Sequence, residues 1–189
     1  MLLKYLEKID DPRRAQGKRF ALSDFLLFSI LAILSGAKSY RDINRFISKK
    51  LTKLNKMFGL SWNKAPSKSQ TRDIICALDK NEVEKAFRGY SGRLLKDKTT
   101  TSALGIDGKS LRGSFDYLKS QDMLQMLSGF CSESKLILGH VDIAEKTNEI
   151  PTAQQLIKEL GLPEGTIYTM DAMHCQKKPS KQLRKQKVS

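Results

Sequence analysis

The chain has 189 residues, 40% of them apolar, and its 34 Lys and Arg outnumber its 20 Asp and Glu for a formal net charge of +14. The apolar content excludes a chain that is disordered throughout, and the charge indicates a polyanionic partner, most often nucleic acid. Three widely separated cysteines argue against a disulfide framework and predict a cytoplasmic protein, while the longest apolar run, FLLFSILAIL, is about half a membrane span, so no membrane partner is expected.

The charge is distributed unevenly along the chain. Residues 1–98 carry a net charge of +12, residues 99–176 a net charge of −4, and residues 177–189 a net charge of +6. This pattern predicts a DNA-binding domain over 1–98, a second domain with a different task over 99–176, and a divergent basic tail over 177–189.

The first half has the pattern of a helical bundle. Ser23 can cap a helix over the apolar run, and Gly36 can end it. Ser39 with Asp42 resembles a capping box that begins a second helix. One face of that helix is apolar, and another carries cations at three- and four-residue spacing, namely Lys38, Arg41, Arg45, Lys49, Lys53 and Lys56. These cations are either a solvated helix face or DNA contacts, and the charge of this half makes the two interpretations about equal.

Two further capped helices follow a turn-prone segment. Ser69 or Thr71 can begin the first, and Asp79 with Glu82 can begin the second. Successive capped helices are compatible with a helix-turn-helix, and equally with an ordinary bundle. The sole tryptophan, Trp62, is more typical of a core or rim residue than of one that stacks on bases.

From residue 99 the pattern becomes β-like. It predicts a short strand ending at Asp107, then two apolar strands over 123–132 and 135–144 joined by the turn SESK. A helix ending at Gly161 and a last strand ending at Asp171 complete this half. A hairpin followed by a crossover helix to a parallel strand predicts an α+β or mixed α/β fold.

Asp107 and Asp171 are the candidate site residues of this half, since each is expected to end a strand. If the two strands are parallel neighbours, both carboxylates lie at the same end of the sheet, where open α/β sheets bind ligands. Close carboxylates repel unless a cation lies between them, and hard oxygen ligands suit Mg²⁺ or Mn²⁺. The alternative is that both are turn-forming aspartates, which are more common at strand ends.

Five blocks of this sequence carry a resemblance to a known family. In order, they are IDDPRRAQGKRFALSDFLLFSILAILSGAKSYRDI, PSKSQTRDII, GIDGKSLRGS, EKTNEIPTAQQLI and YTMDAMHCQKK. Together they resemble the DDE transposases of the H-repeat-associated insertion-sequence family over about residues 9–178. The resemblance implies an N-terminal all-helical transposase-associated domain and a ribonuclease H-like core that cleaves and joins DNA with divalent metal.

The resemblance also implies roles for individual residues. Asp107 and Asp171 match the first two metal-binding acids of the family. Lys109 and Arg112 follow the first acid in the motif, where they are either phosphate contacts or a surface pair. Glu149 matches another block and, at an expected helix entrance, is better suited to capping than to supporting a metal.

The resemblance ends after the last block. The family continues through a further strand and a helix that bears the third acid, whereas this chain runs PSKQLRKQKVS and has no acid after Asp171. The expectation is a C-terminally truncated copy with an incomplete ribonuclease H-like core, inactive in cleavage on its own. The alternatives are a non-catalytic DNA-binding fragment that competes with intact transposase, and a nonfunctional remnant. Double-stranded DNA of element ends is the expected partner, with a second copy or an intact transposase as further candidates.

Overall fold

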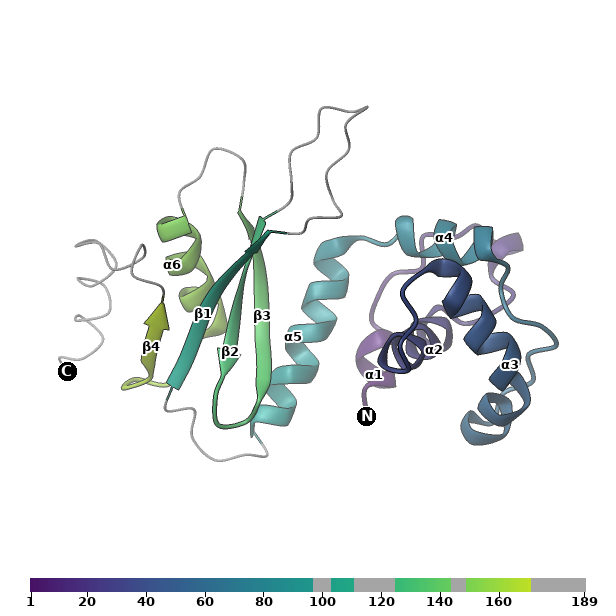
Figure 1. Cartoon of the computed structure of the whole chain (residues 1–189), viewed down its shortest axis with the longest axis horizontal. Helices are drawn as coiled ribbons and strands as arrows, with labels where there is room; N and C mark the ends of the chain where they lie inside the picture. The colour runs from purple at the N-terminus through teal and green to yellow at the C-terminus, as the bar shows by residue number, and fades with distance from the viewer. Residues whose placement is uncertain (97–102, 111–124, 144–148, 171–189) are drawn as a thin grey trace, which may run out of the picture. The chain divides into compact units, whose positions relative to one another are not determined.

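The computed structural model describes residues 1–96, 103–110, 125–143 and 149–170. The chain divides into two compact units, a helical unit (Met1–Ala86) and a sheet unit (Phe87–Ser189), and helix α5 (Lys80–Lys96) crosses the division (Figure 1). In the part of the chain that is described, no helix is long and apolar enough to cross a membrane.

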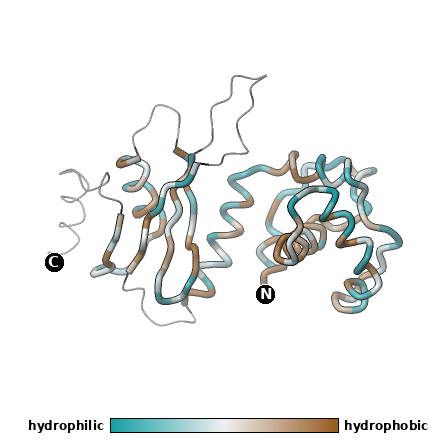
Figure 2. Tube along the Cα trace, viewed as in Figure 1, coloured by the Kyte–Doolittle hydropathy of each residue, from teal (hydrophilic) through white to brown (hydrophobic). Residues whose placement is uncertain are grey.

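The helical unit is built around one apolar helix. Its elements are α1 (Leu3–Leu6), a short 3-10 turn η1 (Ala15–Gly17), α2 (Leu22–Leu34), α3 (Tyr40–Phe58), α4 (Lys68–Cys76) and the first turns of α5. Helix α2 contacts α1 and α3, and α3 contacts α4. Phe25 and Phe28 of α2 are fully buried, and Figure 2 shows how hydrophobic α2 is along its length. An all-round apolar helix needs neighbours on several sides, which explains its central place.

Helix α2 begins earlier than its sequence suggests. The prediction that Ser23 caps it is wrong, because the N-cap is Ala21, which makes no side-chain cap hydrogen bond. Leu22 is buried by this early start. Burying a leucine stabilises by about 1.5–3 kcal/mol, more than the roughly 1 kcal/mol of a serine cap. The predicted end is confirmed, since Gly36 adopts a left-handed φ of 93° just after the helix.

The caps of the next helices are partly as predicted. Ser39 accepts a hydrogen bond from the backbone N of Asp42 and begins α3, which confirms that capping box. Asp79 accepts from the backbone N of Asn81 at 2.7 Å at the start of α5. The prediction of Ser69 or Thr71 as the cap of α4 is wrong: Ser67 caps it, in a reciprocal capping box with Gln70. Thr71 is fully buried, so its side chain belongs to the inner face of α4.

Trp62 is partly buried and packs against the core of the helical unit, which confirms the prediction of a core or rim residue. Its ring lies 4.4 Å from that of Phe20 and 5.0 Å from that of Phe28, centroid to centroid. Both backbone polar groups of Trp62 are bonded to the side-chain amide of Asn55 on α3. The indole therefore closes the core of the helical unit against the end of α3.

The sheet unit contains a four-stranded mixed sheet in the order β3-β2-β1-β4 (Figure 1). Strands β1 (Ala103–Ser110), β2 (Gln125–Cys131) and β3 (Leu136–Ile143) are antiparallel neighbours, and helix α6 (Glu149–Leu160) leads to β4 (Ile167–Met170), which is parallel to β1. The predicted hairpin, crossover helix and parallel last strand are confirmed, and so is the mixed α/β class. Gly161, with a φ of 53°, ends α6 as predicted.

One predicted strand boundary is wrong. Strand β1 does not end at Asp107 but continues to Ser110, because its ladder with β2 runs on from Asp107↔Ser128 to Ser110↔Gln125. A paired antiparallel neighbour satisfies the backbone of both strands, so the glycine after Asp107 does not break the strand. The predicted end of the last strand, Asp171, lies outside the described residues.

Helix α6 packs on one face of the sheet. Helix α6 contacts β2 and β3, and its Leu156 is buried with Leu104 of β1 and Leu127 of β2. Gly139 of β3 leaves room for both helices, since an added Cβ would lie 3.3 Å from Leu160 Cδ2 of α6 and 2.9 Å from Arg88 Nε of α5. Arg88 also forms an ion pair with Glu159 of α6 at 2.5 Å and donates to the carbonyl of His140. The residues that alternate with this buried set lie on the opposite face.

Candidate functional site

Asp107 lies on the face of the sheet opposite α6. Its neighbours Leu104 and Ile106 are buried, whereas the residues from Asp107 to Ser110 are exposed. The described ladder between β1 and β4 ends at Ile106↔Met170, one residue before Asp107, while the ladder with β2 continues. The Asp107 carboxylate thus follows the last described pair of β1 and β4, and 65% of its side chain is exposed.

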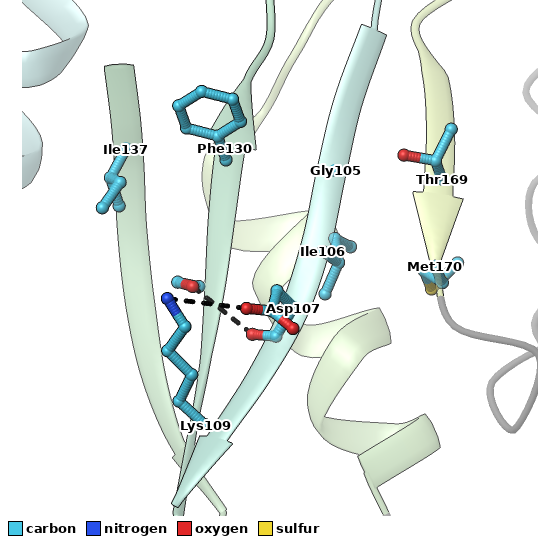
Figure 3. A pocket seen from close by; sticks show the side chains of 9 residues that line it. Gly105, Ile106, Asp107, Lys109, Phe130, Ile137, Thr169 and Met170 are labelled. Carbon is cyan, nitrogen blue, oxygen red and sulfur yellow. Dashed lines mark hydrogen bonds and ion pairs between the residues drawn. The ribbon is translucent and has the colours of Figure 1, made fainter. Parts of the chain in front are cut away.

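A pocket of about 460 Å³ adjoins Asp107 on this face (Figure 3). Strands β1 to β4 all contribute to its lining, which comprises Gly105, Ile106, Asp107, Lys109, Ser128, Phe130, Ile137, Thr169 and Met170. Phe130 and Ile137 are 37% and 40% exposed, so one side of the pocket is an apolar surface open to solvent. Asp107, Lys109 and Ser128 supply polar groups to the lining, so the pocket can accommodate a ligand with both polar and apolar parts.

Two neighbours define the electrostatics of Asp107. Lys109 Nζ lies 3.6 Å from Asp107 Oδ2 on the same face of β1. Ser128, the cross-strand partner of Asp107, donates its hydroxyl to the Asp107 carbonyl oxygen at 3.3 Å. Both side chains of the ion pair are about two-thirds exposed, and such a pair contributes little to stability.

The donor chemistry of Asp107 suits a hard divalent cation. Carboxylate oxygens are preferred ligands of Mg²⁺ and Mn²⁺, and the hydroxyls of Ser128 and Thr169 line the same pocket. Within the described ranges, no three His, Cys, Asp or Glu side chains form a cluster that could hold a metal ion. Asp107 therefore fits such an ion by its chemistry and needs partners from other residues.

Two predicted site residues, Arg112 and Asp171, lie outside the described residues. Glu149 is the first residue of α6, as its expected place at a helix entrance requires. Lys109 pairs with Asp107, and its predicted contact with phosphate stays a prediction.

The predicted cations of the helical unit share one exposed surface, the α3 cationic face. Ile43, Ile47 and Leu54 are the buried residues of α3. The cations at the predicted spacing are all exposed, namely Lys38, Arg41, Arg45, Lys49, Lys53 and Lys56, and Lys50 is a further exposed cation of α3 outside that spacing. Asp42, the one acid of α3, accepts the Ser39 hydroxyl at 2.7 Å, and this hydrogen bond lowers the pKa of its carboxyl. Its nearest cation, Arg45, lies 3.6 Å away, so most of the face has no acid to balance it.

Sequence patterns did not single out the pocket residues Ser128, Phe130 and Thr169. They line the same pocket as Asp107 because of strand register, in the pairs Asp107↔Ser128, Gly105↔Phe130 and Gly105↔Thr169. The predicted hairpin joins β2 to β3, so counting outward from its turn gives only the pairs of those two strands. It gives no register of β2 against β1.

The chain matches a family model described as DDE_Tnp_1-associated over residues 3–91. It is 31% identical to "Putative transposase YncI" of Escherichia coli K12 over 99% of this chain and 74% of that protein. It is 30% identical to "H repeat-associated putative transposase YhhI" of the same strain, over 98% of this chain and 48% of that protein. The chain thus spans about half the length of YhhI and of other relatives that it matches.

A solved structure also aligns with the chain. It is a piggyBac transposase synaptic complex with hairpin DNA, matched with a TM-score of 0.45 and 16% identity over 96% of this chain and 45% of that one. A TM-score at this level does not establish a shared fold. The identity and coverage of the match to YncI do establish the family: the chain belongs to the H repeat-associated transposase family.

Proposed function

We propose that this chain acts in DNA transposition. In this proposal the helical unit binds double-stranded DNA at the ends of an insertion sequence, and the sheet unit supplies Asp107 and Asp171 to a divalent-metal site for phosphodiester cleavage and strand transfer. The sheet unit would then be part of a ribonuclease H-like core. The observation that carries the proposal is the parallel register of β1 and β4, which pairs Ile106 with Met170.

The register matters because of the residues that come next. Asp107 follows Ile106, and Asp171 follows Met170. Parallel strands run in the same direction, so residues that follow a registered pair tend to remain neighbours. Extending the register by one residue would bring together two carboxylates separated by 64 positions in the sequence. Two such groups repel each other, and a shared cation removes that repulsion.

The proposed cofactor is Mg²⁺ or Mn²⁺, held by Asp107 and Asp171. When bound, such an ion stabilises negative charge on phosphodiester oxygens and lowers the pKa of a water molecule. Lys109 Nζ lies 3.6 Å from Asp107 Oδ2. In this proposal it screens the carboxylate in the absence of an ion and would contact a phosphate of the substrate. The open apolar side of the pocket at Phe130 would contact the sugar or base next to that phosphate.

The helical unit supports the DNA part of the proposal. The α3 cationic face presents six exposed cations along about five turns of helix and its entrance. Like charges at this density repel unless an anionic surface lies against them, and duplex DNA supplies about one phosphate charge per 1.7 Å of helix axis. The contacts would be to the backbone, which positions a duplex without reading its sequence.

Manganese binding tests the metal part directly. We would titrate Mn²⁺ into the chain and follow the relaxation of water protons. Asp107→Asn and Asp171→Asn should each weaken binding at least about tenfold, because changes even to residues around metal ligands typically cost 10- to 100-fold. Glu164→Gln is the matched control, since Glu164 is an exposed acid in the loop before β4. Equal affinities for all four proteins would rule out this site.

Lys109→Gln gives a second test with the opposite sign. Removing a cation 3.6 Å from the carboxylate should strengthen Mn²⁺ binding by a few-fold, roughly what Coulomb's law predicts for an exposed pair. A weaker affinity in this variant would contradict the assignment of Asp107 as a ligand.

A second candidate function is a DNA-binding fragment without cleavage activity, favoured by the separation of the α3 cationic face from Asp107 in different units. A nicking assay with Mn²⁺ on duplex DNA carrying insertion-sequence ends separates the candidates. Turnover that disappears in Asp107→Ala indicates the catalytic role, whereas binding without turnover indicates the fragment. A thermal melt without any cooperative transition would indicate a nonfunctional remnant instead.

A further inference from the structure

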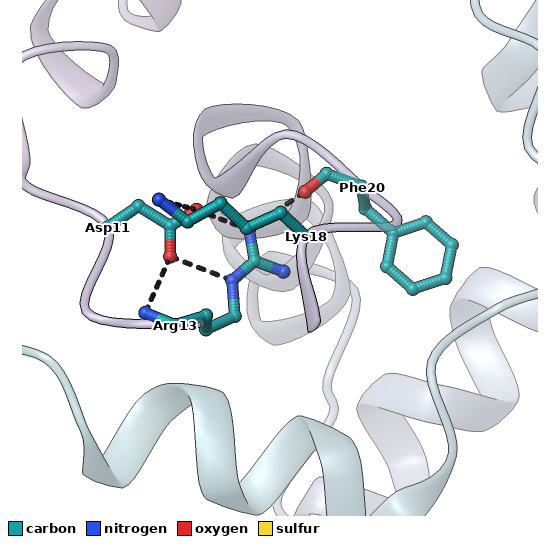
Figure 4. A network of polar contacts seen from close by, with 4 residues as sticks. All are labelled: Asp11, Arg13, Lys18 and Phe20. Atoms are coloured by element: carbon teal, nitrogen blue, oxygen red, sulfur yellow. Dashed lines mark hydrogen bonds and ion pairs between the residues drawn. The ribbon is translucent and has the colours of Figure 1, made fainter. Parts of the chain in front are cut away.

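A basic loop lies between α1 and α2, and a buried arginine holds it in one conformation (Figure 4). Arg13 donates from Nε and Nη2 to the two carboxylate oxygens of Asp11, each at 2.8 Å, and its backbone N donates to the same carboxylate. The same Nη2 donates to the carbonyl oxygen of Phe20 at 2.8 Å, across seven residues. Only 9% of the Arg13 side chain is exposed. Arg13 thus ties the two ends of the loop together.

The end of the loop is attached to α3 through Trp62. The Phe20 ring lies 4.4 Å from the Trp62 ring, and Asn55 near the end of α3 binds both backbone polar groups of Trp62. The loop before α2 therefore meets the end of α3 and the residues that follow it at these three residues. The contacts among Phe20, Asn55 and Trp62 also bring the residues next to them in the sequence close to one another.

The residues next to these anchors are cations. Lys18 and Arg19 precede Phe20, Lys56 follows Asn55, and Lys64 lies two residues after Trp62. All four residues are exposed. Lys18 Nζ lies 4.0 Å from Asp11, whose charge is already matched by Arg13. Among the described residues, no ion pair involves the other three cations.

The surrounding sequence offers these cations no acids. Residues 12–23 contain no Asp or Glu, and neither do residues 43–72, which include the last sixteen positions of α3 and the loop after it. The contacts among Phe20, Asn55 and Trp62 therefore bring together positive charge from two acid-free segments. A surface of this kind repels itself, and it binds polyanions because binding releases their counterions.

We propose that Lys18, Arg19, Lys56 and Lys64 form a second phosphate-binding surface for double-stranded DNA, which we call the Trp62 basic surface. It shares Lys56 with the α3 cationic face, whereas Lys18, Arg19 and Lys64 lie outside α3. Arg13 acts in it as a positioning residue. The proposal rests on the DNA-binding role proposed above and adds to it a site that contacts the backbone without reading bases.

Fluorescence anisotropy of a labelled duplex, measured at several salt concentrations, tests this surface. The variant Lys18→Gln, Arg19→Gln, Lys64→Gln should reduce the slope of log affinity against log salt by about 0.9 for each lost phosphate contact, and equally on two duplexes of unrelated sequence. The control Lys4→Gln, Lys8→Gln, Lys85→Gln removes the same charge from exposed positions of the helical unit. Equal slopes for variant and control would overturn the proposal.

The outcome separates this inference from the proposed function. One outcome is that a variant of the α3 cationic face lowers the salt slope while the triple variant of the Trp62 basic surface matches its control. In that case the Trp62 basic surface is wrong, and DNA binding by the helical unit stands. If the unaltered chain binds no duplex at low salt, both fail.

Asp11→Asn tests the positioning role of Arg13, because net charge and loop conformation predict opposite changes in DNA affinity. The substitution makes the chain more positive by one charge, so net charge alone predicts tighter DNA binding. Loss of the Arg13 contacts releases the loop and should instead weaken binding by a few-fold, with the fluorescence of Trp62 showing that the unit remains folded. Tighter binding would show that the loop conformation does not matter and would overturn the role of Arg13.

Discussion

The helical unit and the sheet unit use charge in different ways. Residues 1–86 contain 18 Lys and Arg against 9 Asp and Glu, and the excess is spread along the exposed face of α3 and the loops beside it. In the sheet unit, interest centres on one carboxylate, Asp107, whose neighbours are set by strand register. DNA binding by the helical unit should decline gradually as its cations are removed one by one. Metal binding by the sheet unit should instead be lost on changing either of the two proposed ligands, Asp107 and Asp171.

The largest expected effect tests whether the units are independently stable. Phe28→Ala removes a fully buried ring that contacts Phe58 and Trp62, and should destabilise the helical unit by about 3–5 kcal/mol. Trp62 is the sole tryptophan, so its fluorescence reports on the helical unit alone, whereas circular dichroism reports on both units. The fluorescence transition should move to lower temperature and part of the dichroism transition should not. Phe130→Ala, at an exposed ring, is the control.

The next effect sharpens the contrast in charge. Arg41→Gln, Arg45→Gln, Lys49→Gln should lower the salt slope of DNA binding by about 2.7, so that raising salt from 50 to 200 mM weakens the unaltered chain about 40-fold more than the variant. Asp107→Asn should leave the slope unchanged in the absence of metal. A similar change of salt slope in the triple variant and in Asp107→Asn would show that DNA binding is not confined to the helical unit.

A smaller effect concerns helix α3 itself. Ser39→Ala removes the side chain that caps α3 and should cost about 1 kcal/mol, measured by thermal melting. Ser23→Ala, which removes a serine that was predicted to cap α2 but does not, should be close to neutral in the same assay. Equal losses would contradict the observed start of α2.

The smallest effect depends on pH. Hydrogen bonding from Arg13 is the main cause that lowers the pKa of the Asp11 carboxyl in the folded chain. A lowered folded pKa stabilises the protein above the unfolded value of about 3.9 and ceases to do so as the pH falls through the folded pKa. The difference in Tm between the unaltered chain and Asp11→Asn should therefore be largest near neutral pH and shrink below about pH 4. A constant difference would assign the effect of the substitution to packing.

The sequence alone determined most of the local structure. Alternation of apolar residues, the SESK turn and Gly161 were enough to predict the hairpin, the crossover helix and the parallel last strand. The Ser39 cap was predictable because its hydrogen bonds join residues three positions apart. The caps at Ala21 and Ser67 were missed because the burial of Leu22 and Thr71, a property of the packed core, decides where those helices begin.

The tertiary structure decided which side chains meet. That β1 continues past Asp107 follows from its ladder with β2, and the presence of Ser128, Phe130 and Thr169 beside the carboxylate follows from register. The grouping of Lys18, Arg19, Lys56 and Lys64 follows from the Phe20–Trp62 contact. Sequence determines spacing along one chain, whereas a site needs proximity between segments. Backbone pairing between strands and the packing of apolar residues set that proximity.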